Sequence, residues 1–472
     1  MHIHVYYNKL THYDTAANNT PMSGGPGGMF LHRTFDKHPE LTYDIRLVNS
    51  PAQFAPIRPG ARILALGAES LKALTQLEPL NKHRGYVLDR AGVPIIATYS
   101  PYDSWSFKVE EDEDDDDGGD EKDVAPTKRQ NYFFWMLADF AKLIKPAFTK
   151  PPSFRTQIRP AINAATLWVD GRPPGSRIVL DIETRIQDHS LDCIGLGDCE
   201  RRESLVVPVY DWTNTLSYDR HGLTKFWRAL SRLFMRADIT IVGHNLAFDL
   251  SVLAARYALP LPRKIYDTML AMHRQFPLTE KSLSHAISFY TDAGRNHKGD
   301  IANNTSQFNF NRLMTYNGDD LSLTAAVAAG QAPYHAADPF LAHAVAEANK
   351  LQLVTLEMSL TGLNINLDSL EIHKQKLRRR DGFLTRCCRF LAGLPEFNPA
   401  SPKQVAEYFY DRLRYEVPEF TKSGARSAGT KTLYKLQVKK PNPLIPLIIE
   451  TRETRKALSM FEANLYQRMA LV

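Results

Sequence analysis

The stretch Ile178-Val-Leu-Asp-Ile-Glu-Thr184 joins a short apolar run to two carboxylates. The apolar run predicts a buried strand that ends in Asp181 and Glu183. Because side chains two apart project from the same face of a strand, both carboxylates point to one side. Such a pair can bind a metal ion, but two solvated acids on an exposed face give the same pattern. Further acids at suitable places decide between these interpretations.

Length and charge limit the possible classes of protein. The chain has 472 residues, of which 43% are hydrophobic, and this predicts roughly two to four packed domains. Its net charge of +6 includes an acidic run over residues 110–123 that contributes −10, so the remainder carries +16. A basic body favours a polyanionic partner, with nucleic acid first, although a basic surface can also serve solubility alone.

No segment predicts secretion or membrane insertion. We find no apolar run near the length of a membrane span, and the first residues lack the pattern of a signal peptide. The four cysteines show no Cys-x-x-Cys spacing and predict neither a zinc site nor a disulfide framework. A reduced, cytoplasmic protein without a membrane partner is expected.

Residues 1–150 alternate strand and helix patterns, which predicts a small α/β domain. The expected elements are strands over 61–66 and 93–98 and helices over 68–77 and 131–144. A disordered insert is expected over 109–126, because its acids repel one another and cannot pack. It is either a solvated spacer or a mimic of nucleic acid that screens a basic surface.

The motifs IRPGARILALGAESLKAL, HRGYVL and GVPIIATYSP of this region resemble the second half of the uracil-DNA glycosylase superfamily. Active relatives usually carry a histidine where this chain has Ser100, and the early acidic motif is not recognisable over 23–30. Without a general base or that histidine, base excision has no evident chemistry. The resemblance therefore implies a docking or DNA-binding scaffold. Six prolines between 146 and 174 then predict an extended linker over 151–175.

Residues 176–335 predict a mixed sheet with helices. Strand patterns over 178–180, 193–197 and 204–210 suggest an antiparallel start, and a further strand over 239–243 leads directly into a helix. Asp249 stands in the first turn of that helix, where the helix dipole favours a carboxylate whether or not a ligand binds. In a later helix, Tyr316 and Asp320 are four apart and share one face. An ordinary buried tyrosine beside a solvated acid gives the same spacing.

Together these motifs resemble the proofreading 3′–5′ exonuclease domain of the DEDD type, in its tyrosine variant. The motifs are Asp181-x-Glu183, Asn245-x-x-Phe248-Asp249 preceded by His244, and Tyr316-x-x-x-Asp320. The segments from Asp267 to Leu270 and from Lys281 to Leu283 also match the family pattern. The resemblance implies a ribonuclease H-like fold.

The resemblance also implies the chemistry of the site. Two divalent ions, Mg²⁺ or Mn²⁺, stabilise the attacking and leaving oxygens of a phosphodiester, and hard cations prefer carboxylate ligands. Asp181, Glu183, Asp249 and Asp320 would bind these ions, and Tyr316 would orient the attacking water. The residues expected to shape the site or hold the terminal nucleotides, with a purely structural role as the alternative, are Thr184, His244, Asn245 and Phe248. The substrate would be a single-stranded 3′ end, and the products nucleoside monophosphates.

Residues 340–472 predict a helical region. One helix over 369–391 contains five basic residues that are candidates for binding DNA phosphates: Lys374, Lys376, Arg378, Arg379 and Arg380. The segments EMSLTGLNINLDSL, FNPASPKQVAEYFYDRL and LIIETRETRKALSMFEANL resemble the start of the thumb of family A DNA polymerases. A helical domain with a solvated charged face is the alternative.

The family's palm and fingers motifs do not follow, so this chain is not expected to synthesise DNA alone. The leading interpretation is the exonuclease subunit of a split, phage-type family A polymerase that binds primer-template DNA and a second chain carrying palm and fingers. Three alternatives remain. They are a non-catalytic DNA-binding or assembly subunit, the N-terminal fragment of an interrupted polymerase gene, and an exonuclease acting on RNA.

Overall fold

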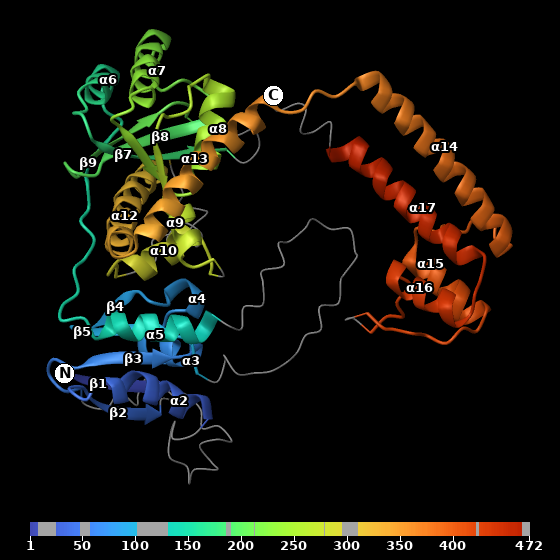
Figure 1. Cartoon of the computed structure of the whole chain (residues 1–472), viewed down its shortest axis with the longest axis horizontal. Helices are drawn as coiled ribbons and strands as arrows, with labels where there is room; N and C mark the ends of the chain where they lie inside the picture. Colours follow the sequence, from blue (N-terminus) through green and yellow to red (C-terminus); the bar gives the residue numbers. More distant parts are fainter. Residues whose placement is uncertain are drawn as a thin grey trace. The chain divides into compact units, whose positions relative to one another are not determined.

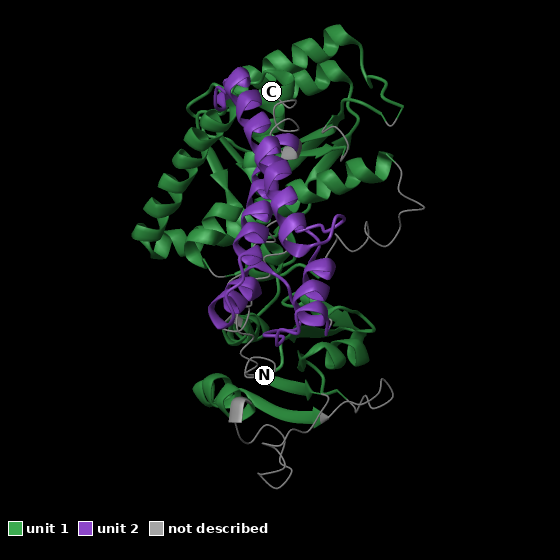
Figure 2. Ribbon diagram, turned by 90° about the vertical axis from the view of Figure 1, so that its right-hand side faces the viewer, with its two compact units in different colours: residues 1–108, 125–360 green, residues 109–124, 361–472 purple. Residues whose placement is uncertain are grey.

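The computed structural model describes residues 1–7, 25–47, 57–101, 131–185, 190–211, 213–277, 279–294, 310–421 and 424–464 (Figure 1). The chain divides into two compact units (Figure 2). The described residues of the first lie within 1–108 and 125–360, and those of the second within 361–472. The acidic run and the insert predicted over 109–126 lie outside the described residues.

The first unit begins with a five-stranded sheet of order β2-β1-β3-β5-β4, in which only β4 is antiparallel to its neighbour. Its strands are β1 (His2–Tyr7), β2 (Thr42–Leu47), β3 (Arg62–Leu66), β4 (Val87–Arg90) and β5 (Val93–Thr98). The helices that connect or cover them are α2 (Gly25–Thr34), η1 (Phe35–Lys37), α3 (Ala68–Thr75), α4 (Leu80–His83) and α5 (Asn131–Leu143). The predicted small α/β arrangement is therefore present.

A second, six-stranded mixed sheet has the order β11-β10-β7-β8-β9-β6. Its strands are β6 (Arg155–Ile158), β7 (Arg177–Thr184), β8 (Leu191–Asp198), β9 (Glu203–Pro208), β10 (Thr240–Gly243) and β11 (Ile265–Asp267). Strands β7, β8 and β9 are antiparallel, as predicted, whereas β10 lies parallel to β7 on its other side.

Helices cover both faces of this second sheet. One face packs on α6 (Ile162–Asp170), α7 (Arg220–Phe234) and α8 (Leu246–Tyr257). The other packs on the long helix α12 (Phe310–Ala337). Two shorter helices, α9 (Thr268–Gln275) and α10 (Leu283–Tyr290), lie between this sheet and the first one. The apolar residues of each strand therefore alternate between two cores, as the strand pattern requires.

The segment 151–175, for which the prolines favoured an extended linker, instead contains β6 and α6. Strand β6 pairs in parallel with β9, and Ala165 and Val169 of α6 are buried in the core. The prolines stand before β6, after it and after α6, so they mark the ends of these elements. Prolines at these positions end the elements without interrupting them, so a proline-rich segment can still contain a strand and a helix.

The boundary of the helical C-terminal region also differs from the prediction. Helix α13 (Pro339–Thr361) ends where the first unit ends, and its buried Asn349, Gln352 and Leu356 contact the second sheet and its helices. The second unit contains α14 (Leu367–Ala392), α15 (Pro402–Ala406), η3 (Glu407–Arg412), α16 (Thr430–Lys439), α17 (Leu444–Ser459) and η4 (Met460–Asn464). All of these elements are helices, so the C-terminal region is helical as predicted. The second unit also has its own apolar core.

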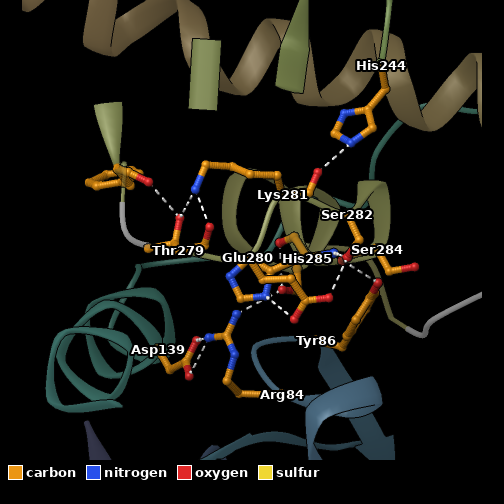
Figure 3. Close-up of polar contacts among 12 residues, drawn as sticks. Arg84, Tyr86, Asp139, His244, Thr279, Glu280, Lys281, Ser282, Ser284 and His285 are labelled. Atoms are coloured by element: carbon orange, nitrogen blue, oxygen red, sulfur yellow. Dashed lines mark hydrogen bonds and ion pairs between the residues drawn. The ribbon is translucent and has the colours of Figure 1, made fainter. Parts of the chain in front are cut away.

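A buried polar cluster joins the two sheets of the first unit. The Arg84 guanidinium, 2% exposed, donates to both carboxylate oxygens of Asp139 at 2.7 and 2.8 Å and to Ser288 Oγ at 3.0 Å. Tyr86 Oη donates to the Ser284 carbonyl at 2.8 Å (Figure 3). Arg84 and Tyr86 precede β4, Asp139 lies in α5, and both serines lie in α10. The cluster therefore fixes α10 against the first sheet.

The Lys142 ammonium lies beside this cluster. Its Nζ donates to the carbonyls of Gly85, Ser288 and Thr291, and burial lowers the pKa of Lys142 to about 7. Apolar residues of β3, β5, α10 and α12 share one core, so the first sheet shares its interior with α12, the helix that also packs on the second sheet. No helix in the described ranges is long and apolar enough to cross a membrane.

Replacing Asp139 with alanine should destabilise the first unit by about 3–5 kcal/mol, because Arg84 would keep a buried charge without its counter-ion. Urea unfolding followed by tryptophan fluorescence measures this free energy. Asp238→Asn is the matched control, since Asp238 pairs with Arg236 at the surface and its loss should cost no more than about 0.5 kcal/mol. Equal costs for the two variants would contradict a structural role for the buried pair.

Candidate active site

Strand β7 divides its side chains between the two faces of the second sheet. Ile178, Leu180 and Ile182 are buried in the core beneath α6, α7 and α8. Val179 faces α12. By alternation, Asp181 and Glu183 share the face of Val179, at the end of the strand where the sheet is less covered, and both are partly exposed.

Helix α12 brings a third acid to this pair. Asp181, Glu183 and Asp320 each offer a carboxylate oxygen, and these three oxygens lie within 4.8 Å of one another. Asp320 is 4% exposed. Three negative charges this close repel one another, and a divalent cation offsets that repulsion. The arrangement favours the metal-binding interpretation of Asp181 and Glu183 over that of two solvated acids.

Asn317 holds the Asp181 carboxylate in place. Its Nδ2 donates to Asp181 Oδ2 at 2.6 Å, and the Asn317 side chain is fully buried. It reaches the strand because Gly195 lies opposite Asp181 in the β7–β8 ladder. A Cβ on Gly195 would stand 2.1 Å from Asn317 Oδ1 and 2.9 Å from Leu321 Cδ1. The absent side chain therefore permits the close approach of α12 to the sheet.

The sequence reasoning assigned no role to Asn317 or Gly195. A signal was present, because Asn317 stands three residues before Asp320 and so shares its helical face. What could not be read from the sequence was the packing distance between α12 and β8, which the contact at Gly195 fixes.

Asp249 occupies a different position from the other three acids. It is 6% exposed in the first turn of α8, and its Oδ1 accepts the Ile182 backbone N–H at 3.0 Å. The β7–β10 ladder ends at Val179 and Val242, so Asp249 supplies an acceptor beyond that end. Burial raises the pKa of Asp249 to about 8. Asp249 is therefore not one of the three acids whose carboxylate oxygens lie within 4.8 Å of one another.

Tyr316 lies on the same helix as Asn317 and Asp320. Its side chain is partly buried, and burial together with the charges of Asp320, Glu183 and Asp181 raises its pKa. The phenol therefore stays protonated at neutral pH, and its hydroxyl is hydrogen-bonded with the Asp320 carboxylate. Asp319, in contrast, is exposed on a neighbouring face of α12.

Asp267 connects the elements around Asp249. This fully buried carboxylate accepts the backbone N–H groups of Asn245 at 3.0 Å, Leu246 at 2.8 Å and Met269 at 2.9 Å. It also accepts Gln352 Nε2 of α13 at 2.9 Å. One side chain therefore caps the starts of α8 and α9 and fixes the first turn that carries Asp249.

The predicted substrate-contacting residues have different environments. Both ring nitrogens of His244 have partners. Nδ1 contacts Thr268 Oγ1 at 2.9 Å. Nε2 contacts the Lys281 carbonyl at 2.7 Å, as Figure 3 shows. Asn245 adopts a left-handed backbone conformation before α8. Phe248 is 39% exposed, and Thr184 ends β7 at a ladder irregularity. His244 is thus fixed as part of the framework, whereas Phe248 presents an aromatic ring to solvent.

Helix α14 uses part of its basic cluster in local ion pairs. Lys374 is buried and pairs with Glu371, Arg378 pairs with Glu371 and Glu462, and Arg380 pairs with Glu450 of α17. Lys376 and Arg379 are exposed. Pairs at the surface contribute little to stability, so the exposed arginines remain able to exchange a carboxylate for a phosphate.

Comparisons with known proteins agree with this geometry. Residues 179–329 match the family model of the 3′–5′ exonuclease domain of family A DNA polymerases. This segment contains the acid cluster, Asp249 and Tyr316. The first unit therefore contains a 3′–5′ exonuclease domain of this family, and the predicted ribonuclease H-like fold with a mixed sheet is confirmed.

Two further proteins are similar over a larger part of the chain. A DNA polymerase of Bacillus phage SP01 is 24% identical over 299 residues, which cover 56% of this chain and 30% of that relative. The chain thus spans less than a third of its length. The other is the polymerase domain of Pol1 from M. smegmatis, solved with primer-template DNA and dNTP. The superposition covers 65% of this chain and 49% of that chain, with 16% sequence identity and a TM-score of 0.47.

Replacing Asn317 with alanine should weaken Mn²⁺ binding at the acid cluster by about 10–100-fold, because Asp181 would lose the group that orients it. Titration followed by electron paramagnetic resonance of free Mn²⁺ measures this. Asn311→Ala, at an exposed position of the same helix, should bind Mn²⁺ like the unmodified protein. Unchanged affinity in Asn317→Ala would show that the hydrogen bond does not organise the cluster.

Asp249 gives a prediction about pH and stability. Because its pKa is raised from 3.8 to about 8, the folded protein holds a proton that the unfolded chain releases within that window. Stability of the metal-free protein therefore falls as pH rises from about 4 to 8. Asp249→Asn removes this dependence and, at pH 9 in EDTA, should raise Tm by about 2–4 °C, which corresponds to about 1 kcal/mol.

The two proteins should differ less in Tm at pH 5, where Asp249 is protonated. A Tm difference that does not change between pH 5 and pH 9 would exclude Asp249 as the titrating group. Differential scanning fluorimetry over that range provides the measurement.

Proposed function

We propose that this chain is a metal-dependent 3′–5′ DNA exonuclease that proofreads for a phage-type family A DNA polymerase. The observation that carries the proposal is the convergence of Asp181, Glu183 and Asp320 from β7 and α12 within a matched exonuclease domain. The reaction is hydrolysis of the 3′-terminal phosphodiester, which releases a nucleoside monophosphate.

The donor set fits magnesium or manganese. All three clustered ligands are carboxylates, which hard cations prefer, and two of them are partly exposed and therefore accessible to a substrate. Asp249 would supply the fourth carboxylate ligand for two ions. It would bind through Oδ2, because Oδ1 accepts the hydrogen bond of the Ile182 N–H. When bound, the ions supply positive charge to the attacking and leaving oxygens of the phosphodiester.

The protein's own groups would orient and position the reactants. Asn317 fixes the Asp181 carboxylate, and Asp267 fixes the helix turn that carries Asp249. The neutral phenol of Tyr316, which is hydrogen-bonded with Asp320, would orient the attacking water beside the acids. Phe248 offers an exposed ring on which a terminal base can stack, which suits a substrate of unpaired nucleotides.

The remaining regions support the polymerase context. We assign the first sheet and its helices, residues 1–150, to a uracil-DNA glycosylase-like scaffold without base-excision chemistry, since Ser100 replaces the expected histidine. We assign 340–472 to a thumb-like region that binds duplex phosphates through exposed Lys376, Arg379 and their neighbours.

A second chain with palm and fingers is the proposed partner of the C-terminal unit. Helix α14 exposes Phe383, Phe390 and Leu391, and these line an open hollow with Leu447 of α17. Phe390 is 86% exposed, and such an apolar group on a charged helix is typical of an interface. Co-purification with the product of a neighbouring gene tests this part of the proposal independently of exonuclease activity.

Asp181→Ala should lower the rate of 3′ shortening of a 5′-labelled single-stranded DNA by at least about 100-fold, because it removes a ligand of the ions that stabilise the transition state. The assay uses the full chain with Mg²⁺ or Mn²⁺ and gel separation of the products. Asp170→Asn, an acid paired with Arg232 at the surface of the same unit, should leave the rate unchanged.

Inactivity of the unmodified chain with every cation, alone and with a palm-bearing partner, would overturn the catalytic proposal and leave a DNA-binding subunit. Equal cleavage of RNA and DNA of the same sequence would contradict a role in DNA proofreading and favour an RNA-processing enzyme. Release of nucleosides instead of nucleoside monophosphates would exclude the proposed bond cleavage.

A further inference from the structure

The first sheet carries a cluster of histidine and carboxylate side chains far from the exonuclease motifs in the sequence. His2 and His4 lie two apart on β1, so they share one face of the sheet. In the parallel β1–β2 ladder, His2 pairs with Thr42 and His4 pairs with Asp44. The ring centroids of the two histidines are 4.6 Å apart. The register of two neighbouring strands therefore assembles the cluster.

One oxygen of Asp44 stands between the two imidazoles. Asp44 Oδ1 is 2.5 Å from His4 Nδ1 and 3.5 Å from His2 Nε2. One ligand atom from each of the three residues lies within 4.8 Å of the others. Two imidazole nitrogens and a carboxylate oxygen form a donor set that suits zinc, which accepts nitrogen and oxygen ligands in tetrahedral geometry.

Hydrogen bonds around the cluster hold its members in orientations suited to an ion. His2 Nδ1 contacts Thr42 Oγ1 at 2.9 Å, which leaves Nε2 as the nitrogen directed at Asp44. Asp44 Oδ2 accepts Arg46 Nε at 2.9 Å, which turns Oδ1 toward the histidines. Metal ligands are commonly supported in this way by a hydrogen bond from the atom that does not bind the ion.

Two buried nitrogens give an independent indication of a missing ligand. Among the described residues, the buried His4 Nε2 has no hydrogen-bond partner, and the buried His2 Nε2 has only the long 3.5 Å contact with Asp44 Oδ1. The His4 side chain is fully buried. A buried polar atom without a good partner costs free energy, so these two nitrogens call for an explanation.

We propose that His2, His4 and Asp44 bind a divalent transition-metal ion of the zinc class. The three residues supply three ligands, and water occupies the fourth position. The ion links β1 to β2, which is the edge strand of the first sheet, and so serves to stabilise the sheet. This inference does not depend on exonuclease activity.

An ordinary polar cluster is the competing explanation. Arg46 already pairs with Asp44 at 2.9 Å, and its positive charge opposes a cation nearby. That ion pair accounts for the orientation of Asp44, but it gives the buried His4 Nε2 no hydrogen-bond partner. The carboxylate has a separate oxygen for each neighbour, Oδ2 for Arg46 and Oδ1 for the histidines. Metal binding therefore explains more of the observed geometry than the ion pair alone.

The test uses the full chain without a polyhistidine tag. Because the exonuclease acids also attract divalent ions, Asp181→Asn and Asp320→Asn are combined to remove that site. This background protein is dialysed against Zn²⁺ and then against buffer, and its zinc content is measured by atomic emission. One zinc ion per chain is expected to remain. Zinc X-ray absorption should show imidazole nitrogens at about 2.0–2.1 Å, which a carboxylate-only site cannot supply.

His2→Gln in the same background should weaken zinc binding by at least about 100-fold, since losing a direct ligand costs no less than losing a supporting group. His2→Cys should retain tight binding, because a thiolate is also a zinc ligand. The matched control is His32→Gln, whose exposed imidazole likewise contacts an aspartate, Asp36, at 2.8 Å. It should bind zinc like the background protein.

Position 2 begins the strand and is partly exposed, so these variants are expected to fold, and circular dichroism verifies this. Zinc also should raise the unfolding temperature of the background protein but not that of its His2→Gln variant. Absence of retained zinc, or equal retention by His2→Gln and His32→Gln, would overturn the proposal. Zinc X-ray absorption spectra with oxygen ligands only would do the same.

Discussion

The close approach of α12 to β8 is the constraint on which the candidate active site depends. Gly195 lacks a side chain opposite Asp181, and Asn317 fills that space with its amide directed at the Asp181 carboxylate. The same packing sets the depth at which Asp320 and Tyr316 meet β7. A side chain at position 195 would therefore displace α12 and with it Asn317, Tyr316 and Asp320, because close-packed interiors are only slightly compressible.

A second buried contact organises the other side of the site. Asp267 accepts hydrogen bonds from the starts of α8 and α9 and from α13, so helices distant in sequence meet at a single carboxylate. These hydrogen bonds fix the first turn of α8 and with it Asp249, whose carboxylate accepts a further hydrogen bond from the Ile182 N–H. Asp320 on α12 and Asp249 on α8 therefore approach the β7 acids from two separately supported substructures.

Much of this site could be predicted from local periodicity. Alternation placed Asp181 and Glu183 on one face, and helical spacing placed Tyr316 beside Asp320. Contacts that depend on packing distance could not be predicted, such as Asn317 against Gly195 or Arg380 against Glu450. The prediction of a linker over 151–175 is wrong because its prolines lie at the ends of β6 and α6 and leave both elements intact. The extent of the first unit through α13 could not be predicted because the contacts of α13 are long-range: Asn349 and Gln352 with Asp267, and Leu356 with the core.

The polar cluster around Arg84 and Lys142 has a consequence for the evolution of the first unit. Domains joined by exposed linkers are exchanged readily between genes, because each retains its own surface when separated. Here α10 contributes Ala286 and Ile287 to the core of the first sheet, and its backbone carbonyls accept the buried Lys142 ammonium. Separating the sheets would expose both an apolar face and a desolvated charge. The N-terminal fold and the exonuclease fold are therefore expected to be inherited together, with substitutions on one side of the junction matched by changes on the other.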